Sequence, residues 1–260
     1  MRKRKPSEIQ RAVIFALVLR EARARIGATR MGAFWTLAEP LLHITAFTLL
    51  YGTIRGSQTA SLPFSIFLFV GLSPFILFRN ISLRMMDSLD ANRALFSYKQ
   101  ILPIDTFVAR TIVEFFVAAI VYLVIALGFG WFGFPSAISH PLEWIIAISL
   151  GCTLSFSLGM TFSVITREMP QLKIIIRIAF LPLYLVSGVF FSPSSLPPQA
   201  LTLLQINPYF HLIELLRSYA LPSYSTVQGT SIMYVLSVTL VFLFSSFFLY
   251  HIKRRELVRL

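Results

Sequence analysis

Long uninterrupted runs of apolar residues dominate this sequence. The run from Val117 to Leu127 does not alternate with polar residues, as a strand of a transmembrane barrel would. An α-helix needs about 17–25 mainly apolar residues to cross a bilayer. Six segments meet this requirement: 34–54, 62–83, 107–132, 142–166, 174–191 and 232–252. The sequence therefore predicts an all-α membrane protein with six transmembrane helices in one domain, 34–252.

Basic residues fall on one side of these predicted spans. All 23 Lys and Arg residues except Arg55 and Arg217 lie before the first span, in or near the even-numbered connections, or after the last span. Such a bias marks the cytoplasmic side of a membrane protein. Both ends are therefore expected in the cytoplasm (N-in/C-in), with a cytoplasmic tail over 253–260. The net charge of +12 then reflects topology, and nucleic acid is not an expected partner.

The N-terminal segment, residues 1–33, contains an apolar run over 12–19 that is too short to cross a membrane. Basic clusters flank this run on both sides. Anionic lipid attracts such clusters, so a helix lying at the cytoplasmic interface and leading into the first span is expected. The alternative is an additional buried helix.

The cytoplasmic connection over 84–105 is too long for a simple turn. Asp90 and Asn92 are good helix N-caps, and Pro103 is expected to end the segment. Apolar side chains that a solvated loop would lack are also present, namely Leu95, Phe96, Tyr98, Ile101 and Leu102. The pattern predicts a short amphipathic helix at the membrane surface that docks a soluble partner.

The outer connection over 192–230 contains five prolines that separate apolar stretches too short to cross: Pro193, Pro197, Pro198, Pro208 and Pro222. Half-length helices broken by proline are candidates for re-entrant segments, which are tolerated only where protein or a watery cavity covers them. This pattern predicts the gate or mouth of a pathway. Glu214 and Arg217 share a helical face and are expected to hold an outer gate, unless they form an exposed pair of little energetic value.

Residue patterns for chemistry by this chain alone are missing from the sequence. It has no G-x-x-x-x-G-K-[ST] phosphate loop, and its four histidines are too scattered to bind a metal ion. No catalytic or metal-binding residues are therefore predicted, and no cofactor is expected on this chain. A membrane path powered by another protein is favoured over an integral membrane transferase, which would need an acidic or histidine cluster.

Polar and aromatic residues within the first and fifth spans are candidates for lining this path. Trp35 and Glu39 lie in the first span and Tyr184 lies in the fifth. Intramembrane charges are costly and often functional. Interhelical hydrogen bonds, interfacial anchoring and packing between helices are the alternatives for these residues.

Three motifs resemble one known family when taken in order. The first runs from Leu19 through Arg20, Glu21 and Arg30 to Pro40; the second is Asn92 to Pro103; the third is Ile206 to Arg217. Together they resemble the ABC-2-type permeases that export capsular polysaccharide and O-antigen. The likeness covers nearly the whole chain.

This resemblance implies a homodimer in the bacterial inner membrane that docks two copies of a cytoplasmic ATPase subunit, where ATP and Mg bind. The expected substrate is a lipid-linked acidic capsular polysaccharide, passed on to periplasmic and outer-membrane export proteins. O-antigen, drug or lipid export are alternatives. The implied site residues are Asp90, Asn92, Leu95, Phe96, Tyr98 and Lys99 for ATPase coupling; Arg20, Glu21, Arg23 and Arg25 at the interface; and Asn207, Pro208, Glu214 and Arg217 at the outer gate.

Overall fold

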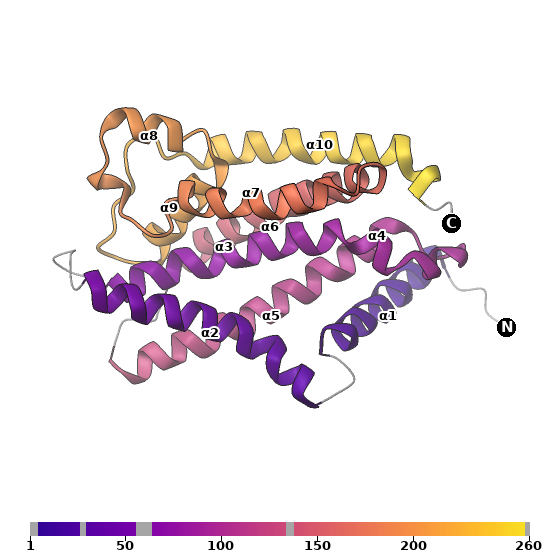
Figure 1. Cartoon of the computed structure of the whole chain (residues 1–260), viewed down its shortest axis with the longest axis horizontal. Helices are drawn as coiled ribbons and strands as arrows, with labels where there is room; N and C mark the ends of the chain where they lie inside the picture. The colour runs from indigo at the N-terminus through magenta and orange to yellow at the C-terminus, as the bar shows by residue number, and fades with distance from the viewer. Residues whose placement is uncertain (1–4, 27–29, 56–63, 134–137, 258–260) are drawn as a thin grey trace.

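The computed structural model describes residues 5–26, 30–55, 64–133 and 138–257 (Figure 1). Parts of the predicted N-terminal segment and of the predicted tail, residues 1–4, 27–29 and 258–260, lie outside the described residues. The described ranges contain no strand, which confirms the all-helical fold. The elements are α1 (Pro6–Ile26), α2 (Arg30–Arg55), α3 (Phe64–Met86), α4 (Ser88–Ala91), the 3-10 helix η1 (Arg93–Ser97), α5 (Pro103–Trp131), α6 (Pro141–Glu168), α7 (Leu172–Val186), the 3-10 helix η2 (Pro193–Ser195), α8 (Pro198–Leu204), α9 (Pro208–Ala220) and α10 (Ile232–Leu257).

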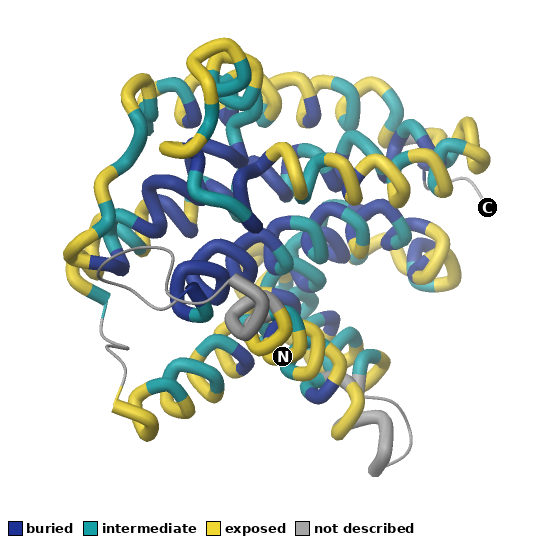
Figure 2. Tube along the Cα trace, turned by 60° about the vertical axis from the view of Figure 1, so that its left-hand side comes forward, coloured by how far each residue is buried: buried dark blue, intermediate teal, exposed yellow. Residues whose placement is uncertain are grey.

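Helix α3 forms the centre of the bundle. It packs against α2, α5, α6 and α9, and 78% of its most apolar stretch is buried, against 17% for α10. Glycines permit its close contact with α6, because a Cβ at Gly151 would lie 2.2 Å from the Phe78 ring. Figure 2 shows this buried centre in dark blue, with exposed residues on the surrounding helices.

The outer helices present apolar side chains outward. On α5 and α10 these include Phe116, Leu123, Phe244 and Phe248. A soluble protein rarely exposes such large apolar surfaces, whereas lipid is a suitable environment for them. Helices α3, α5, α6 and α10 are each long and apolar enough to cross a membrane.

Two predicted spans differ from these four. Helix α2 covers the prediction of 34–54 and contains Pro40, where the helix bends in Figure 1, as expected for an internal proline. Helix α7 has 15 residues and ends at Val186, so the predicted span of 174–191 extends too far. The chain leaves the helix at Ser187 and Gly188, and Gly188 has a φ of 70°, which favours glycine.

The prolines of the outer connection begin helices there. Pro198 and Pro208 occupy the first positions of α8 and α9, where a missing N–H costs no hydrogen bond. The two half-length helices lie at one end of the bundle (Figure 1). The opposite end holds the start of α1, the end of α10 and α4.

The connection over 84–105 differs from the single amphipathic helix predicted. It consists of the short α4 and the 3-10 helix η1, separated at Asn92, whose φ of −110° and ψ of 9° lie outside the helical region. Asn92 was expected to be an N-cap, but its side chain caps no helix N-terminus; its Nδ2 instead donates to the Ser88 carbonyl at 3.0 Å. Helix α1 is longer than the apolar run at 12–19, and it packs against α5 and α2.

Candidate functional site

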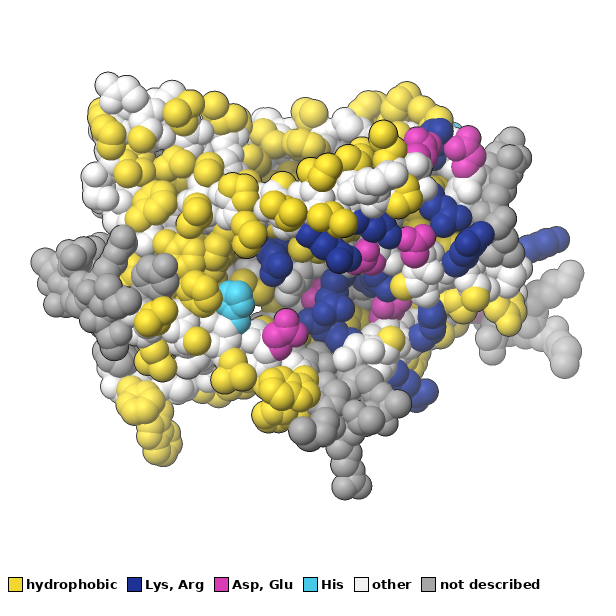
Figure 3. Space-filling view, in the orientation of Figure 1, with side chains coloured by type: hydrophobic (Ala, Val, Ile, Leu, Met, Phe, Trp, Pro, Cys, Tyr) yellow, Lys and Arg dark blue, Asp and Glu magenta, His cyan; other side chains and the backbone are white. Residues whose placement is uncertain are grey.

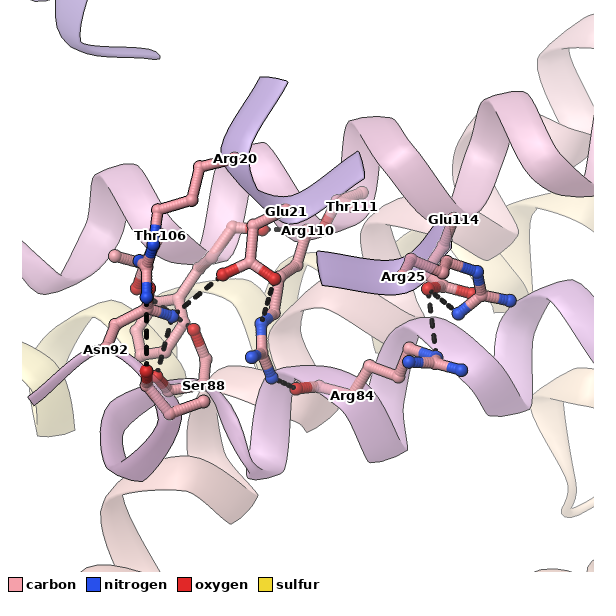
Figure 4. Close-up of polar contacts among 12 residues, drawn as sticks. Arg20, Glu21, Arg25, Arg84, Ser88, Asn92, Thr106, Arg110, Thr111 and Glu114 are labelled. Carbon is pink, nitrogen blue, oxygen red and sulfur yellow. Dashed lines mark hydrogen bonds and ion pairs between the residues drawn. The ribbon is translucent and has the colours of Figure 1, made fainter. Parts of the chain in front are cut away.

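Asn92 joins the N-terminal helix to the connection between α3 and α5 (Figure 4). Its Nδ2 donates to Glu21 Oε1 at 2.9 Å, and its Oδ1 accepts a hydrogen bond from Arg20 Nη1. Asn92 is fully buried, so its amide needs these partners to offset lost hydration. The predicted interfacial pair Arg20–Glu21 and the predicted coupling residue Asn92 therefore form one contact between segments about 70 residues apart.

A second set of contacts continues this network toward α5. Glu21 Oε2 lies 3.1 Å from Arg110 Nε, and Arg110 also donates to the Arg84 carbonyl at the end of α3. Arg25, another of the predicted interfacial residues, forms an ion pair with Glu114. Glu114 Oε1 also lies 3.0 Å from Arg84 Nε. Glu114 is only 4% exposed. Buried charges require such partners, so α1 is fixed to both α3 and α5.

The other side of the connection carries exposed ion pairs. Asp90 lies 3.1 Å from Arg167 and 2.5 Å from Lys173, and Asp87 lies 2.7 Å from Arg177. These cations belong to the end of α6 and to α7. The hydrogen bond from Lys173, with smaller contributions from Arg167, holds the pKa of Asp90 below its usual value despite partial burial. The coupling segment, defined here as residues 87–99 with α4 and η1, is therefore held on two sides.

The six predicted coupling residues divide by exposure. Asp90, Tyr98 and Lys99 are exposed, Tyr98 by 64%, and Leu95 is partly exposed. Asn92 and Phe96 are buried, and so cannot form the outer contact surface in this conformation. A cavity of about 570 Å³ lies beside Tyr98, between α1 and η1, with Leu17 and Leu95 in its walls. Arg23, the remaining interfacial residue, is exposed on α1.

At the opposite end, Arg217 is completely buried in α9. Its Nη1 donates to the Gly188 carbonyl and its Nη2 to the Val189 carbonyl, each at 2.8 Å. The guanidinium also lies 3.7 Å from the centre of the Phe67 ring, a cation–π contact. Arg217 therefore connects α9 with α3 and with the chain just after α7.

The other predicted outer residues surround the same place. Glu214 Oε1 lies 3.4 Å from Arg217 Nη1 and accepts a hydrogen bond from the Tyr224 hydroxyl at 2.6 Å. Asn207 caps α9 by accepting from the Tyr209 N–H at 3.0 Å, and its amide donates to Ser187 Oγ at 2.9 Å. Pro208 follows as the first helical residue. Glu214 and Arg217 form a buried pair, so the exposed-pair alternative is wrong.

The candidate pathway residues lie on α2 and α7. Trp35 and Glu39 are exposed and one helical turn apart on α2. Tyr184, on α7, packs against Phe75 and Phe190 with ring centres 4.9 and 4.6 Å apart. Figure 3 shows a band of basic side chains crossing the face that these helices border, with acidic side chains beside it.

Arg84, Arg110 and Glu114 contribute to the cytoplasmic network but were not among the predicted site residues. Glu114 could be noticed as a charge within a span. Its partners could not be identified, because Arg25 is 89 residues away in sequence. Within the described ranges, no group of three or more His, Cys, Asp or Glu side chains could hold a metal ion.

Membrane-length helices, half-helices at one end and a charged network at the other define an integral membrane protein. The particular family follows from comparison: residues 12–221 match the model of the family described as ABC-2 type transporter. The chain belongs to this family, and the predicted resemblance is confirmed.

The chain is similar to transport proteins over most of its length. It is 33% identical to the polysialic acid transport protein KpsM of Escherichia coli, over 96% of this chain and 97% of KpsM. It is 30% identical to the capsule polysaccharide export inner-membrane protein CtrC of Neisseria meningitidis serogroup B, over 81% of this chain and 79% of CtrC. The O-antigen export system permease protein RfbA of Myxococcus xanthus is 23% identical, over 95% of this chain. A permease rather than an enzyme is therefore confirmed as its class.

Proposed function

We propose that this protein is the permease subunit of an ATP-driven exporter of capsular polysaccharide in the bacterial inner membrane. The similarity to KpsM over almost the full length of both chains carries this proposal. Capsule export is favoured over O-antigen export because KpsM and CtrC are 33% and 30% identical, whereas RfbA is 23% identical. A lipid-linked, acidic polymer is the proposed substrate.

Six membrane spans with both ends in the cytoplasm are part of this proposal. Four helices have suitable length and composition, and α2 has 26 residues. The 15 residues of α7 extend about 22 Å, and Val189 and Phe190, which follow the helix, are buried. Arg167, Lys173 and the coupling segment then lie at the cytoplasmic end, in agreement with the positive-inside bias, and α8 and α9 form a re-entrant segment at the outer end.

The coupling segment is the proposed contact with an ATPase subunit, two copies of which would serve a homodimer. ATP and Mg would bind in those subunits. Tyr98 and Lys99 are exposed for contact, while Asn92 connects the same segment to α1. Because α1 packs against α2, displacement of the coupling segment by the ATPase would shift α2 and thereby open the path.

The path itself is proposed to lie between two copies of the chain, at the face bordered by α2 and α7. Exposed apolar residues on α7, including Ile178 and Leu181, suit a protein or lipid environment. Glu39 on α2 is exposed, and charge at membrane depth is stable only in water or against protein. Trp35 and Tyr184 would border the same path, and periplasmic and outer-membrane export proteins would receive the polymer.

The outer cluster, formed by Asn207, Pro208, Glu214 and Arg217, is proposed to hold a gate. Asn207 and Arg217 both bond to the chain at the end of α7, which makes α7 and α9 move together. A gate between two copies would then open by displacement of this pair of helices, with Pro208 and Glu214 fixing the position of α9.

Deletion of the gene tests the substrate. Loss of surface capsule, restored by the intact gene, is the expected result, and normal capsule in the deletion strain contradicts the proposal. Loss of O-antigen instead would favour the second candidate.

Cysteine crosslinking tests the ATPase contact. A cysteine at Tyr98 or Lys99 should crosslink to the co-expressed ATPase, and one at the outer residue Leu203, which is 68% exposed, should not. Failure at both cytoplasmic positions in an intact complex contradicts this contact.

A further inference from the structure

Arg79 differs from three other arginines in the cytoplasmic half of the bundle. Arg25 and Arg84 pair with Glu114, and Arg177 pairs with Asp87. For Arg79, which is partly exposed, the structure gives no ion pair or hydrogen bond to any described residue. Arg79 lies inside the membrane-length helix α3, seven residues before its end at Met86, or about 10 Å along the axis.

An unpaired guanidinium at this depth is costly against lipid. It is stable where it faces water or meets an anion, so the surroundings of Arg79 decide between ligand binding and a solely structural role. The two helices that border the proposed path, α2 and α7, both pack against α3.

His43 on α2 lies within electrostatic range of both Arg79 and Glu39. The imidazole ring stacks on Phe47, with ring centres 4.9 Å apart and planes 16° apart. One helical turn from Arg79 toward the outer end, Phe75 packs against Tyr184 of α7. Phe75 and Arg79 are four residues apart and so share a face of α3, and Figure 3 shows a histidine next to basic side chains on the face that α2 and α7 border.

This combination fits an acidic sugar. A guanidinium binds a carboxylate through two parallel hydrogen bonds, and the partly exposed rings of Phe47 and Tyr184 provide flat apolar surface for the apolar face of a pyranose ring. We propose that Arg79, with His43 beside it, binds the carboxylate of acidic sugar residues as they pass. This inference rests on the proposed export function. Polysialic acid, named for the relative KpsM, carries such a carboxylate on every residue.

The test uses the complete permease–ATPase complex in lipid nanodiscs. The probes are fluorescent oligosialic acid and a dextran oligomer of equal length, which is neutral. The variants are Arg79→Gln, Arg79→Lys and the control Arg254→Gln, which changes an exposed arginine of α10. A hydrogen bond between charged groups contributes substantially to the free energy of binding. Arg79→Gln should therefore weaken oligosialic acid binding by about ten-fold or more.

The matched results separate this site from general charge effects. Arg79→Lys should retain part of the affinity, Arg254→Gln should bind as the wild type does, and dextran binding should be equal in all four proteins. Equal oligosialic acid affinity in wild type and Arg79→Gln would overturn the proposal. Competition by inorganic phosphate at concentrations where acetate has no effect would also overturn it, by assigning the site to a phosphate group.

Export by the source bacterium distinguishes failure of this site from failure of the proposed function. Surface polysaccharide is measured in strains carrying each variant at equal membrane abundance. Arg79→Gln should reduce export several-fold while Arg254→Gln does not. If deletion of the gene abolishes capsule but the Arg79→Gln variant exports normally, the proposed export function is retained and the proposed binding site at Arg79 is wrong. If deletion leaves capsule intact, the proposed function itself is wrong.

Discussion

The two ends of the molecule hold their helices in different ways. At the cytoplasmic end, at least eight charged or polar side chains from α1, α3, the coupling segment, α5 and α7 share the contacts, and some are exposed. At the outer end, one fully buried arginine connects α3, α9 and the chain after α7. The difference suggests that the cytoplasmic contacts can rearrange step by step, whereas the outer contacts hold or fail together.

Arg217→Ala should give the largest effect. The change leaves Glu214 without its buried partner and removes the donors to the Gly188 and Val189 carbonyls. Breaking a buried pair costs roughly 3–5 kcal/mol in the free energy of unfolding. Thermal unfolding in detergent should show a strongly lowered Tm. Arg93→Ala on exposed η1 is the control, and an equal Tm for both variants would contradict the dependence on a single arginine.

Gly71→Ala should also disturb the outer cluster, through sterics alone. An added Cβ would lie 2.4 Å from Arg217 Nη2, and the guanidinium cannot move without losing its carbonyl partners. Overpacking of this kind costs about 1–3 kcal/mol. The same change in an Arg217→Ala background should cost much less, so a double-mutant cycle measures the coupling. Additive effects of Gly71→Ala and Arg217→Ala on the free energy of unfolding would contradict the steric contact between residue 71 and Arg217.

Asn92→Ala tests the cytoplasmic network. It removes the contacts of Asn92 with Arg20 and Glu21, at a cost of about 1–3 kcal/mol. The remaining pairs Glu21–Arg110 and Arg25–Glu114 should keep α1 in place. Crosslinking of Tyr98 to the ATPase should persist while export falls. Ser97→Ala on the same segment is the control, and full export by Asn92→Ala would show that α1 does not transmit the motion.

Asp90→Asn should have the smallest effect, below about 1 kcal/mol, because exposed ion pairs contribute little. Since the pKa of Asp90 is lowered in the folded protein, its stabilisation is present above the usual aspartate value of about 3.9 and is lost as the pH falls through the lowered value. The Tm difference between wild type and variant should therefore vanish in acid and shrink in high salt. A difference that persists in both conditions would contradict an exposed pair.

Sequence reasoning located the helices well, because long apolar segments specify them independently of neighbours. Local turn chemistry was harder to predict. The coupling segment became two short pieces since Asn92 bonds to α1 rather than capping a helix, and α7 ended early at Gly188.

Partnerships across the fold could not be predicted. The spacing of Glu214 and Arg217 placed them on one helical face. The burial of Arg217, however, depends on the carbonyls of Gly188 and Val189, which follow α7 in the chain. In the same way, Gln10 bonds to Asp105 across 95 residues. The roles assigned to residues in coupling, gating and the path stay predictions.

The sequence separation between α1 and its partners has a consequence for biosynthesis. Arg25 is made 89 residues before Glu114, and a ribosome adding about 5–20 residues each second needs on the order of ten seconds to bridge that interval. During this time α1 has no α5 against which to pack. Helix α1 is therefore expected to lie first at the membrane surface, with its arginines among anionic lipid headgroups. It would pack against α5 only after the later helices have entered the bilayer.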